Sequence, residues 1–220
     1  MKRTRPVNAS ATSQKLLSAA IDLFGRQGFE GTSIREIARQ AKANIAAIAY
    51  HFGGKEELYR ACLEHIVRYV GQGLSEQLRP VDDVGLDAEQ ARAALKETVF
   101  AMTAFMLATP QVASFVRLVV REQMDPTPSF DLLYRNFMEP MHRRLCRLWA
   151  LASGADAESE ATKIAVFSLL GQVLLFRIAR AGALRRMGWR DIGEHELAIL
   201  RERIGINVDL LTRPVEGKTE

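Results

Sequence analysis

The sequence contains few of the residues that mark catalytic, metal-binding or disulfide-linked proteins. Its 220 residues include two cysteines and four histidines. Cys62 and Cys146 are far apart and lack metal-ligand spacing, and no histidine stands at a motif distance from a carboxylate or a cysteine. A glycine-rich phosphate loop is also missing. We therefore expect two buried free thiols, no metal ion, no cofactor and no enzymatic activity.

Long apolar runs and strand patterns are missing as well. No uninterrupted apolar run reaches the roughly 18 residues of a membrane-spanning helix, and the basic N-terminus lacks the apolar segment of a signal peptide. The prediction is a cytoplasmic protein without membrane association. No segment alternates apolar and polar residues between turn signals. With 48% hydrophobic and 25% charged residues, the predicted fold class is all-α, with a sizeable core.

Positive charge is concentrated in the first quarter of the chain. The formal net charge is +4. Residues 1–60 contain ten Lys and Arg against five Asp and Glu, whereas the remaining residues contain 20 against 21. This asymmetry predicts that the N-terminal part meets a polyanion.

Apolar residues spaced three and four apart predict helices along most of the chain. The expected N-terminal helices cover residues 13–26, 34–40, 45–51 and 55–78. After a polar break at 79–87, further helices are expected at 88–108, from 110 to the break at 124–129, and at 130–151, 159–183 and 189–211. Ser33 and Glu36 have capping-box spacing, and Asn44 is a suitable helix cap. Gly53 and Gly54 predict a sharp turn.

The two short helices and their tight turn at 41–44, braced by the first helix, predict a helix-turn-helix unit. In such a unit the second short helix enters the major groove of DNA. Ile48 and Phe52 are expected to face the core, which leaves the small residues free to approach base edges. Ala and Ile side chains can touch thymine methyl groups, and Asn44 can pair with adenine.

The end of this helix carries residues that suit a phosphate backbone. The hydroxyl of Tyr50 and the imidazole of His51 can both donate hydrogen bonds to phosphate oxygens. Lys55 stands at the N-terminus of the next helix, where free N–H groups and the helix dipole also favour an anion.

Residues 13–59 resemble the DNA-binding domain of TetR-type transcriptional regulators. The resemblance is carried by LLSAAIDLFGRQGFEGTSIREIARQAKANIAAIAYHFGGKEELY, with its glycines, its TS-I-REIA helix and its YHF-x-x-KEELY end. It implies phosphate contacts by Thr32 or Ser33 and by Tyr50, His51 and Lys55, and base contacts by Asn44 to Ala47. The predicted DNA-binding residues are Thr32, Ser33, Lys42, Asn44, Ile45, Ala46, Ala47, Tyr50, His51 and Lys55. Two positions depart from the family pattern, because Lys42 replaces the usual turn glycine and Ala49 replaces an aromatic residue.

The segment FVRLVVREQMDPTPSFDLLY, residues 115–134, resembles the C-terminal domain of the CecR-like branch of this family. The expected organisation is a flexible basic arm (1–12), a helix-turn-helix domain (13–59), a helical ligand-binding and dimerisation domain (60–212) and a polar tail (213–220).

Apolar stripes rich in Phe and Met in the C-terminal helices fit either core packing or a pocket for apolar ligands. Arg117 and Arg121 lie four residues apart. They can bind an acidic ligand group or form an internal ion pair with Glu122 or another carboxylate. The predicted ligand-binding candidates are Met102, Phe105, Arg117, Arg121, Phe137 and Met141.

The helix around Gln172 is apolar nearly all round, which predicts burial on both sides. By resemblance, the last two helices form a four-helix dimer bundle. Gly171 would then permit close approach of the helices, and Gln172 would bond across. The dimer-interface candidates are Phe167, Gly171, Gln172 and Leu175.

The predicted function is a dimeric repressor that a small apolar or amphipathic compound releases from a palindromic operator. The two recognition helices would enter successive major grooves of double-stranded DNA. The alternative is a helical adaptor that binds protein and uses the same scaffold without DNA binding. The positive N-terminal charge and the lack of bulky residues on the outer face of the third helix favour the repressor.

Overall fold

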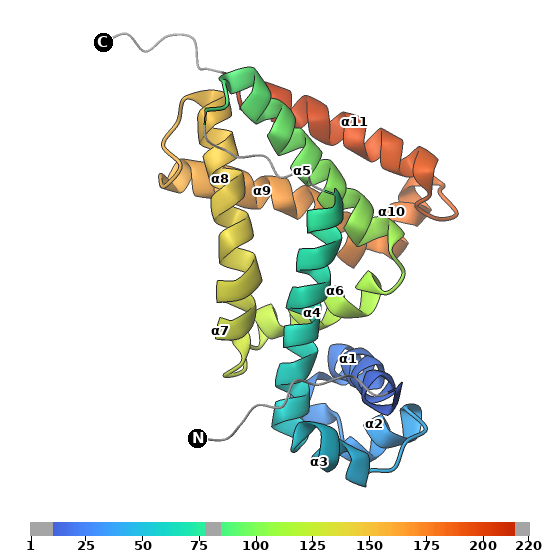
Figure 1. The fold of residues 1–220 in the computed structure, drawn as a ribbon. Helices are drawn as coiled ribbons and strands as arrows, with labels where there is room; N and C mark the ends of the chain where they lie inside the picture. Colours follow the sequence, from blue (N-terminus) through green and yellow to red (C-terminus); the bar gives the residue numbers. More distant parts are fainter. Residues whose placement is uncertain (1–10, 78–84, 214–220) are drawn as a thin grey trace. The chain divides into compact units, whose positions relative to one another are not determined.

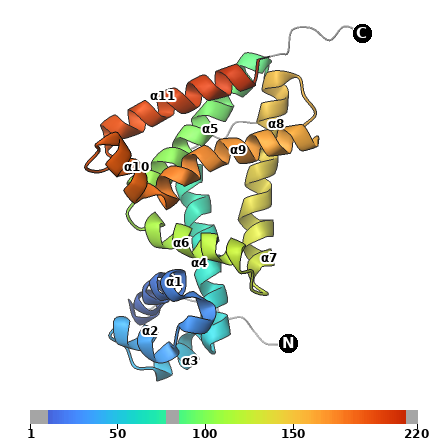
Figure 2. The ribbon, with the colours of Figure 1, turned by 180° about the vertical axis from the view of Figure 1, so that it is seen from behind.

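A computed structural model describes residues 11–77 and 85–213, and in this part of the chain the regular elements are helices without strands (Figures 1 and 2). The all-α prediction is confirmed. Residues 1–10 of the predicted arm and residues 214–220 of the predicted tail lie outside the described ranges. Residues 11 and 12, which were expected in the arm, begin the first helix.

The chain divides into two compact units. Unit 1 contains the residues up to Tyr69 together with Ser114–Leu133, and unit 2 contains Val70–Ala113 together with the residues from Tyr134 onward. This division does not coincide with the predicted boundary after residue 59. Helix α4 (Lys55–Gln77) contributes to both units, and most of α6 (Val112–Met124) belongs to the unit that holds the short helices.

Unit 1 is built from α1 (Ala11–Gly31), α2 (Ile34–Gln40), α3 (Ala46–Phe52), the first part of α4, most of α6, and α7 (Phe130–Leu133). Helix α1 extends past the predicted end at residue 26, across a kink at Gly28 where φ is 80°. The largest fully buried side chains of this unit come from several helices and form one core; they include Leu16, Ile21, Phe24, Ile37, Ile48, Leu58, Leu63, Ile66 and Leu118.

Local capping signals of unit 1 fold as the sequence predicts. The Ser33 hydroxyl accepts the N–H of Glu36, while the Glu36 carboxylate accepts the N–H of Ser33, so the capping box is complete. Gly53 ends α3 with φ of 100°, a conformation that disfavours residues with a Cβ. These caps satisfy backbone groups that two seven-residue helices would otherwise leave open.

Unit 2 contains the end of α4, α5 (Ala88–Ala108), the π-helix η1 (Tyr134–Met138), α8 (Glu139–Ser153), α9 (Glu160–Ile178), α10 (Arg180–Met187) and α11 (Glu194–Leu211). Helix α5 contacts α8, α9 and α11, and both views show α11 lying along α5 and α9 crossing α8 (Figures 1 and 2). Side-chain bonds support this packing: the Lys96 ammonium lies 2.8 Å from Asp209, and the Arg92 guanidinium donates to Thr212 and to the carbonyl of Ala152.

Three helices predicted between residues 130 and 211 have other boundaries in the structure. The expected helix at 130–151 is divided into α7, η1 and α8, because Pro140 has no N–H for the helical ladder and the preceding turn widens. The expected helix at 159–183 breaks at Ala179 into α9 and α10. Gly188, with φ of 71°, ends α10, so the last helix begins at Glu194 rather than at residue 189.

Helix α9 is long and apolar enough, by length and composition, to cross a membrane. Lys163 and Arg177 interrupt this helix, so it contains no uninterrupted apolar run of the length that the sequence analysis excluded. Core helices of soluble proteins pass the same test. A large part of the apolar surface of α9 is not covered within the chain.

The turn between α2 and α3 stores backbone strain at Lys42, which has φ of 51°. A left-handed residue with a Cβ costs about 1–2 kcal/mol. We predict that Lys42→Gly raises the free energy of unfolding by about 0.5–1 kcal/mol in urea denaturation, after the greater flexibility of glycine in the unfolded chain is allowed for. Lys42→Ala is the matched control and should bring no gain. A glycine variant no more stable than the alanine variant would contradict the account.

Candidate nucleic-acid interface

Helix α3 presents a small, largely apolar outer face. Tyr50 is 81% exposed, whereas Ile48 on the inner face is 1% exposed. Among the predicted base-contacting residues, Asn44, Ile45 and Ala46 are exposed and Ala47 is half-buried. Phe52, expected in the core, is only half-buried. The helix is therefore held mainly through Ile48, and its other face is open to solvent.

Asn44 lies one residue before the N-cap of α3, which is Ile45 and makes no side-chain cap bond, so Asn44 is not the N-cap that the sequence predicted. Its side-chain oxygen accepts the N–H of Ala46 at 2.9 Å. A bidentate contact to adenine uses both the oxygen and the amide nitrogen of an Asn side chain. The N–H of Ala46 occupies that oxygen in the free protein, so pairing with adenine would require Asn44 to release or share this bond.

The C-terminal end of α3 gathers the predicted phosphate-binding residues. The rings of Tyr50 and His51 lie edge to face with their centroids 4.9 Å apart. Lys55 begins α4, and its ammonium lies 4.4 Å from the centroid of the Phe29 ring, a cation–π contact. These three residues combine a hydroxyl, an imidazole and an ammonium near the free N–H groups of a helix start, a chemistry that suits phosphate.

The structure separates the two predicted phosphate ligands before α2. Thr32 is buried, and its hydroxyl donates to the carbonyl of Gly28 at 2.7 Å. Ser33 is exposed. Donation from the Ser33 N–H and hydroxyl lowers the pKa of the Glu36 carboxyl below its usual value. Of the pair, Ser33 stands at the surface and Thr32 does not.

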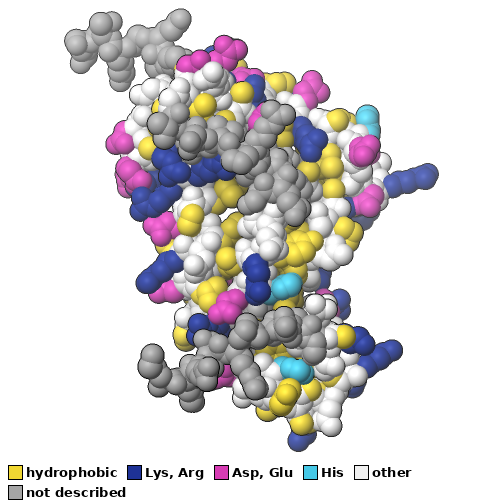
Figure 3. Space-filling view, viewed as in Figure 1, with side chains coloured by type: hydrophobic (Ala, Val, Ile, Leu, Met, Phe, Trp, Pro, Cys, Tyr) yellow, Lys and Arg dark blue, Asp and Glu magenta, His cyan; other side chains and the backbone are white. Residues whose placement is uncertain are grey.

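Exposed cations surround the short helices. Lys42 lies at the surface of the turn. Helix α2 exposes Arg35 and Arg39, which were not among the predicted DNA-binding residues. A spacing of four residues places Arg35 and Arg39 on one face of the helix, and this pattern could have been recognised in the sequence. Figure 3 shows Lys and Arg side chains projecting at the end of unit 1 that carries α2 and α3.

Hydrogen bonds to one carboxylate, that of Asp22, connect α1, α2 and α6 within unit 1. The Asp22 carboxylate accepts hydrogen bonds from Arg117 at 3.1 Å, from Arg26 at 3.0 Å and from Gln40 at 3.1 Å. At Gly25, an added Cβ would lie 3.3 Å from atoms of α6. The internal ion pair considered for Arg117 therefore exists, but its carboxylate is Asp22 rather than Glu122.

Glu122 is instead the centre of a buried network. Its carboxylate accepts the hydroxyl of Tyr59 on one oxygen, and the N–H and hydroxyl of Thr127 on the other, at 3.0 and 2.7 Å. Glu122 is fully buried, and burial followed by the bond to Glu122 raises the pKa of Tyr59 above its ordinary value. The network ties the start of α4 to α6 and to the α6–α7 loop.

The six predicted ligand-binding residues do not come together in one unit. Arg117 and Arg121 belong to unit 1, where Arg121 donates to the carbonyl of Arg26 at 3.2 Å. Met102 and Phe105 on α5 are buried in unit 2, and Phe137 and Met141 are half-buried there.

Three of the four dimer-interface candidates lie on an uncovered stripe of α9. Phe167 and Leu175 are each 61% exposed, and Gly171 between them is open to solvent. Gln172, which was expected to bond across a dimer, accepts a hydrogen bond from Asn207 of the same chain at 2.8 Å.

Two family profiles match this chain. The family profile described as "Bacterial regulatory proteins, tetR family" matches residues 16–62, and the profile described as "HTH-type transcriptional dual regulator CecR, C-terminal domain" matches residues 91–213. The HTH-type transcriptional dual regulator CecR of Shigella flexneri is 30% identical over 97% of this chain and 96% of its own length. The chain belongs to the TetR family of bacterial transcriptional regulators, in its CecR-like branch. The recognition made from the sequence is confirmed, and members of this family are regulators rather than enzymes.

Other relatives and solved structures of the TetR family agree. The HTH-type transcriptional repressor NicS of Pseudomonas putida is 32% identical over 54% of this chain and 52% of its own length. A TetR-like regulator from Rhodococcus sp. RHA1 superimposes with a TM-score of 0.64 at 19% identity, over 93% of this chain and 97% of the other. AibR, solved with isovaleryl coenzyme A and operator DNA, gives 0.65 at 17% identity, over 93% and 100%. At these identities the structural likeness supports the fold.

Tyr59→Phe tests the buried network of the DNA-binding unit. The variant removes one donor from a buried carboxylate, so we predict a loss of about 1.5–3 kcal/mol in the free energy of unfolding, measured by urea denaturation at fixed protein concentration. Tyr50→Phe is the matched control. Its hydroxyl is on an exposed residue of the same unit, and its effect should stay within about 0.5 kcal/mol. Equal effects of the two variants would refute the role given to Tyr59.

Proposed function

We propose that this TetR-family regulator is a dimeric repressor that binds a palindromic operator through α3 and leaves it when a small apolar or amphipathic compound binds. The observation that carries DNA binding is the outer face of α3, with Tyr50 exposed beside His51 and Lys55. A helix with small exposed side chains can approach base edges closely, and the flanking polar groups suit phosphate. The relatives are named as transcriptional regulators, which favours this function over a protein-binding adaptor.

The proposed dimer interface is the uncovered apolar surface of α9 and α11. On α9 it comprises Ile164, Phe167, Leu175 and Ile178, and on α11 Ile199, Ile206 and Leu210 are also exposed. The two helices contact each other, and several large exposed apolar side chains on neighbouring helices are typical of an interface. A two-fold dimer would place two copies of α3 against two half-sites about one DNA turn apart.

For the effector, the proposed position is among the Met and Phe side chains of unit 2: Met102, Phe105, Phe137 and Met141. AibR is described with both a coenzyme A thioester and operator DNA, which supports a ligand-responsive mechanism for proteins of this fold. Helix α4 contributes residues to both units, so we propose that it transmits ligand binding to the DNA-binding helices. The compound can act only through its different affinities for the DNA-bound and released states.

The first test is a fluorescence-anisotropy titration with DNA from immediately upstream of the gene. We predict salt-sensitive binding, since phosphate contacts release counterions. The double variant Tyr50→Ala, Lys55→Ala should weaken binding by about tenfold or more and flatten the dependence on salt.

A control variant of the same residue types is available in unit 2. Tyr134→Ala with Lys163→Ala removes a partly exposed tyrosine and a lysine outside the helix-turn-helix, and DNA affinity should not change. Equal affinities of the Tyr50/Lys55 variant and the native protein, with both folded by circular dichroism, would exclude the proposed phosphate contacts.

The dimer is tested by placing charge on its proposed surface. Phe167→Glu with Leu175→Glu should raise the dimer dissociation constant by about 100-fold or more, because each interface would bury unpaired carboxylates. Size-exclusion chromatography with light scattering should then show monomer. Met124→Glu with Leu151→Glu, also at exposed apolar positions but on α6 and α8, should leave the dimer intact. A dimeric Phe167/Leu175 variant would show that the interface lies elsewhere.

A further inference from the structure

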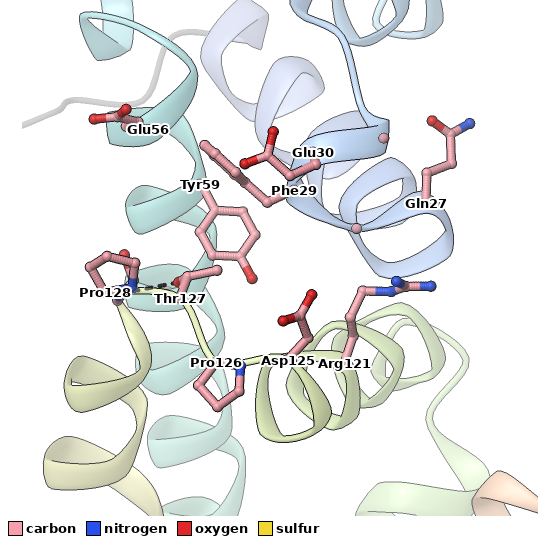
Figure 4. A pocket seen from close by; sticks show the side chains of 13 residues that line it. Gln27, Phe29, Glu30, Glu56, Tyr59, Arg121, Asp125, Pro126, Thr127 and Pro128 are labelled. Carbon is pink, nitrogen blue, oxygen red and sulfur yellow. Dashed lines mark hydrogen bonds between the residues drawn. The ribbon is translucent and has the colours of Figure 1, made fainter.

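Unit 1 contains a pocket of about 490 Å³ that none of the proposed DNA or dimer contacts uses. It lies where the end of α1, the first turns of α4, the end of α6 and the α6–α7 loop meet (Figure 4). The residues important here are Phe29, Glu30, Tyr59, Arg121, Asp125 and Thr127. Small-molecule sites in proteins range from about 300 to 1,000 Å³, so the volume suits a compact organic ligand.

Two walls of the pocket are held in place by the buried Glu122. This carboxylate accepts the Tyr59 hydroxyl and both donors of Thr127. The Thr127 hydroxyl oxygen in turn accepts the N–H of Ser129 at 3.1 Å, a bond drawn in Figure 4. The aromatic wall on α4 and the wall formed by the α6–α7 loop are therefore fixed before any ligand binds, and a preformed site loses less conformational entropy on binding.

The charge of the lining is negative and uncompensated. Glu30 from α1, Glu56 from α4 and Asp125 after α6 line the pocket, and within the described residues none of these side chains makes a hydrogen bond or an ion pair. Arg121 is the cation of the lining, and its guanidinium is already engaged with the carbonyl of Arg26. Three carboxylates against one guanidinium favour a cationic ligand.

Aromatic rings add a second attraction for a cation. The rings of Phe29 and Tyr59 lie edge to face with their centroids 5.1 Å apart, and both residues line the pocket. The Lys55 ammonium lies 4.4 Å from the centroid of Phe29, so this ring already contacts one cation within the protein. Aromatic faces combined with carboxylates are the chemistry that recognises organic cations.

We propose that this pocket binds a small organic cation with an apolar or aromatic body. The carboxylates of Glu30 and Asp125 attract the charge, and Phe29, Tyr59 and the loop prolines contact the body. The site is separate from the proposed effector residues of unit 2. An acidic ligand group, which Arg121 alone would suit, is disfavoured by the surrounding carboxylates. Ligand binding to the pocket is measured without DNA. A negative result would therefore contradict this proposal without bearing on the proposed function.

The experiment is isothermal titration calorimetry of the full-length protein with tetraphenylphosphonium. Tetraphenylborate has the same shape and the opposite charge, so it serves as the ligand control. We expect saturable binding of the phosphonium at one site per chain and binding of the borate at least tenfold weaker. No binding of the phosphonium, or borate binding of equal strength, would overturn the proposal.

Two variants locate the site. Glu30→Gln with Asp125→Asn should weaken phosphonium binding by roughly tenfold, since both carboxylates are on exposed residues and an exposed charge pair contributes about three- to fivefold. Glu57→Gln with Glu97→Gln changes the net charge equally, at exposed positions outside the pocket, and should leave binding unchanged. Circular dichroism confirms that both variants fold. Unchanged binding in the Glu30/Asp125 variant, or equal weakening in both variants, would contradict the assignment.

Discussion

The carboxylate of Glu122 is the interaction on which the DNA-binding unit depends. A buried carboxylate without partners costs several kcal/mol, so the fold must supply donors for both of its oxygens. Tyr59 supplies one from α4, and Thr127 supplies two from the α6–α7 loop. The Tyr59 ring also packs edge to face against Phe24 and Phe29 of α1. One buried charge thus fixes the helices that carry the helix-turn-helix, and two walls of the pocket beside them.

The open outer face of α3 is a consequence of how few residues hold this short helix in place. A seven-residue helix is too short to be stable alone, so it must be held by its neighbours. Ile48 anchors it in the core, Asn44 accepts the N–H of Ala46 at its start and Gly53 turns its end. Because these few residues hold the helix, the side chains at its outer positions are not needed for packing. Small residues and one exposed tyrosine can occupy them, which leaves room for a base edge and a phosphate.

Local features could be predicted from the sequence. The two short helices α2 and α3, the capping box at Ser33, the tight turn between these helices and the buried Ile48 each depend on residues a few positions apart. The family was also evident, because its motif is a continuous segment. Helix breaks were harder to predict: the π-helix before Pro140 and the break at Ala179 interrupt apolar patterns that continue across them.

Long-range partners could not be predicted in this way. For Arg117 the sequence left open a ligand or an ion pair with Glu122 or another carboxylate, and it did not identify the actual partner, Asp22, which lies 95 positions away. Tyr59 and Glu122 are 63 positions apart, and periodicity carries no signal for such a contact. The assignment of most of α6 to the DNA-binding unit and the pocket beside it follow from these pairings. For the same reason, the two arginines were expected at a ligand site of the C-terminal domain.

We propose that the outer face of α3 reads operator DNA. The most direct measurement is a selection of random genomic fragments by the full-length protein, followed by footprinting of the enriched sequences. The account predicts an enriched palindrome whose half-sites lie about one DNA turn apart, with protection in successive major grooves. Fragments retained without a shared sequence, or no retention at low salt, would contradict it.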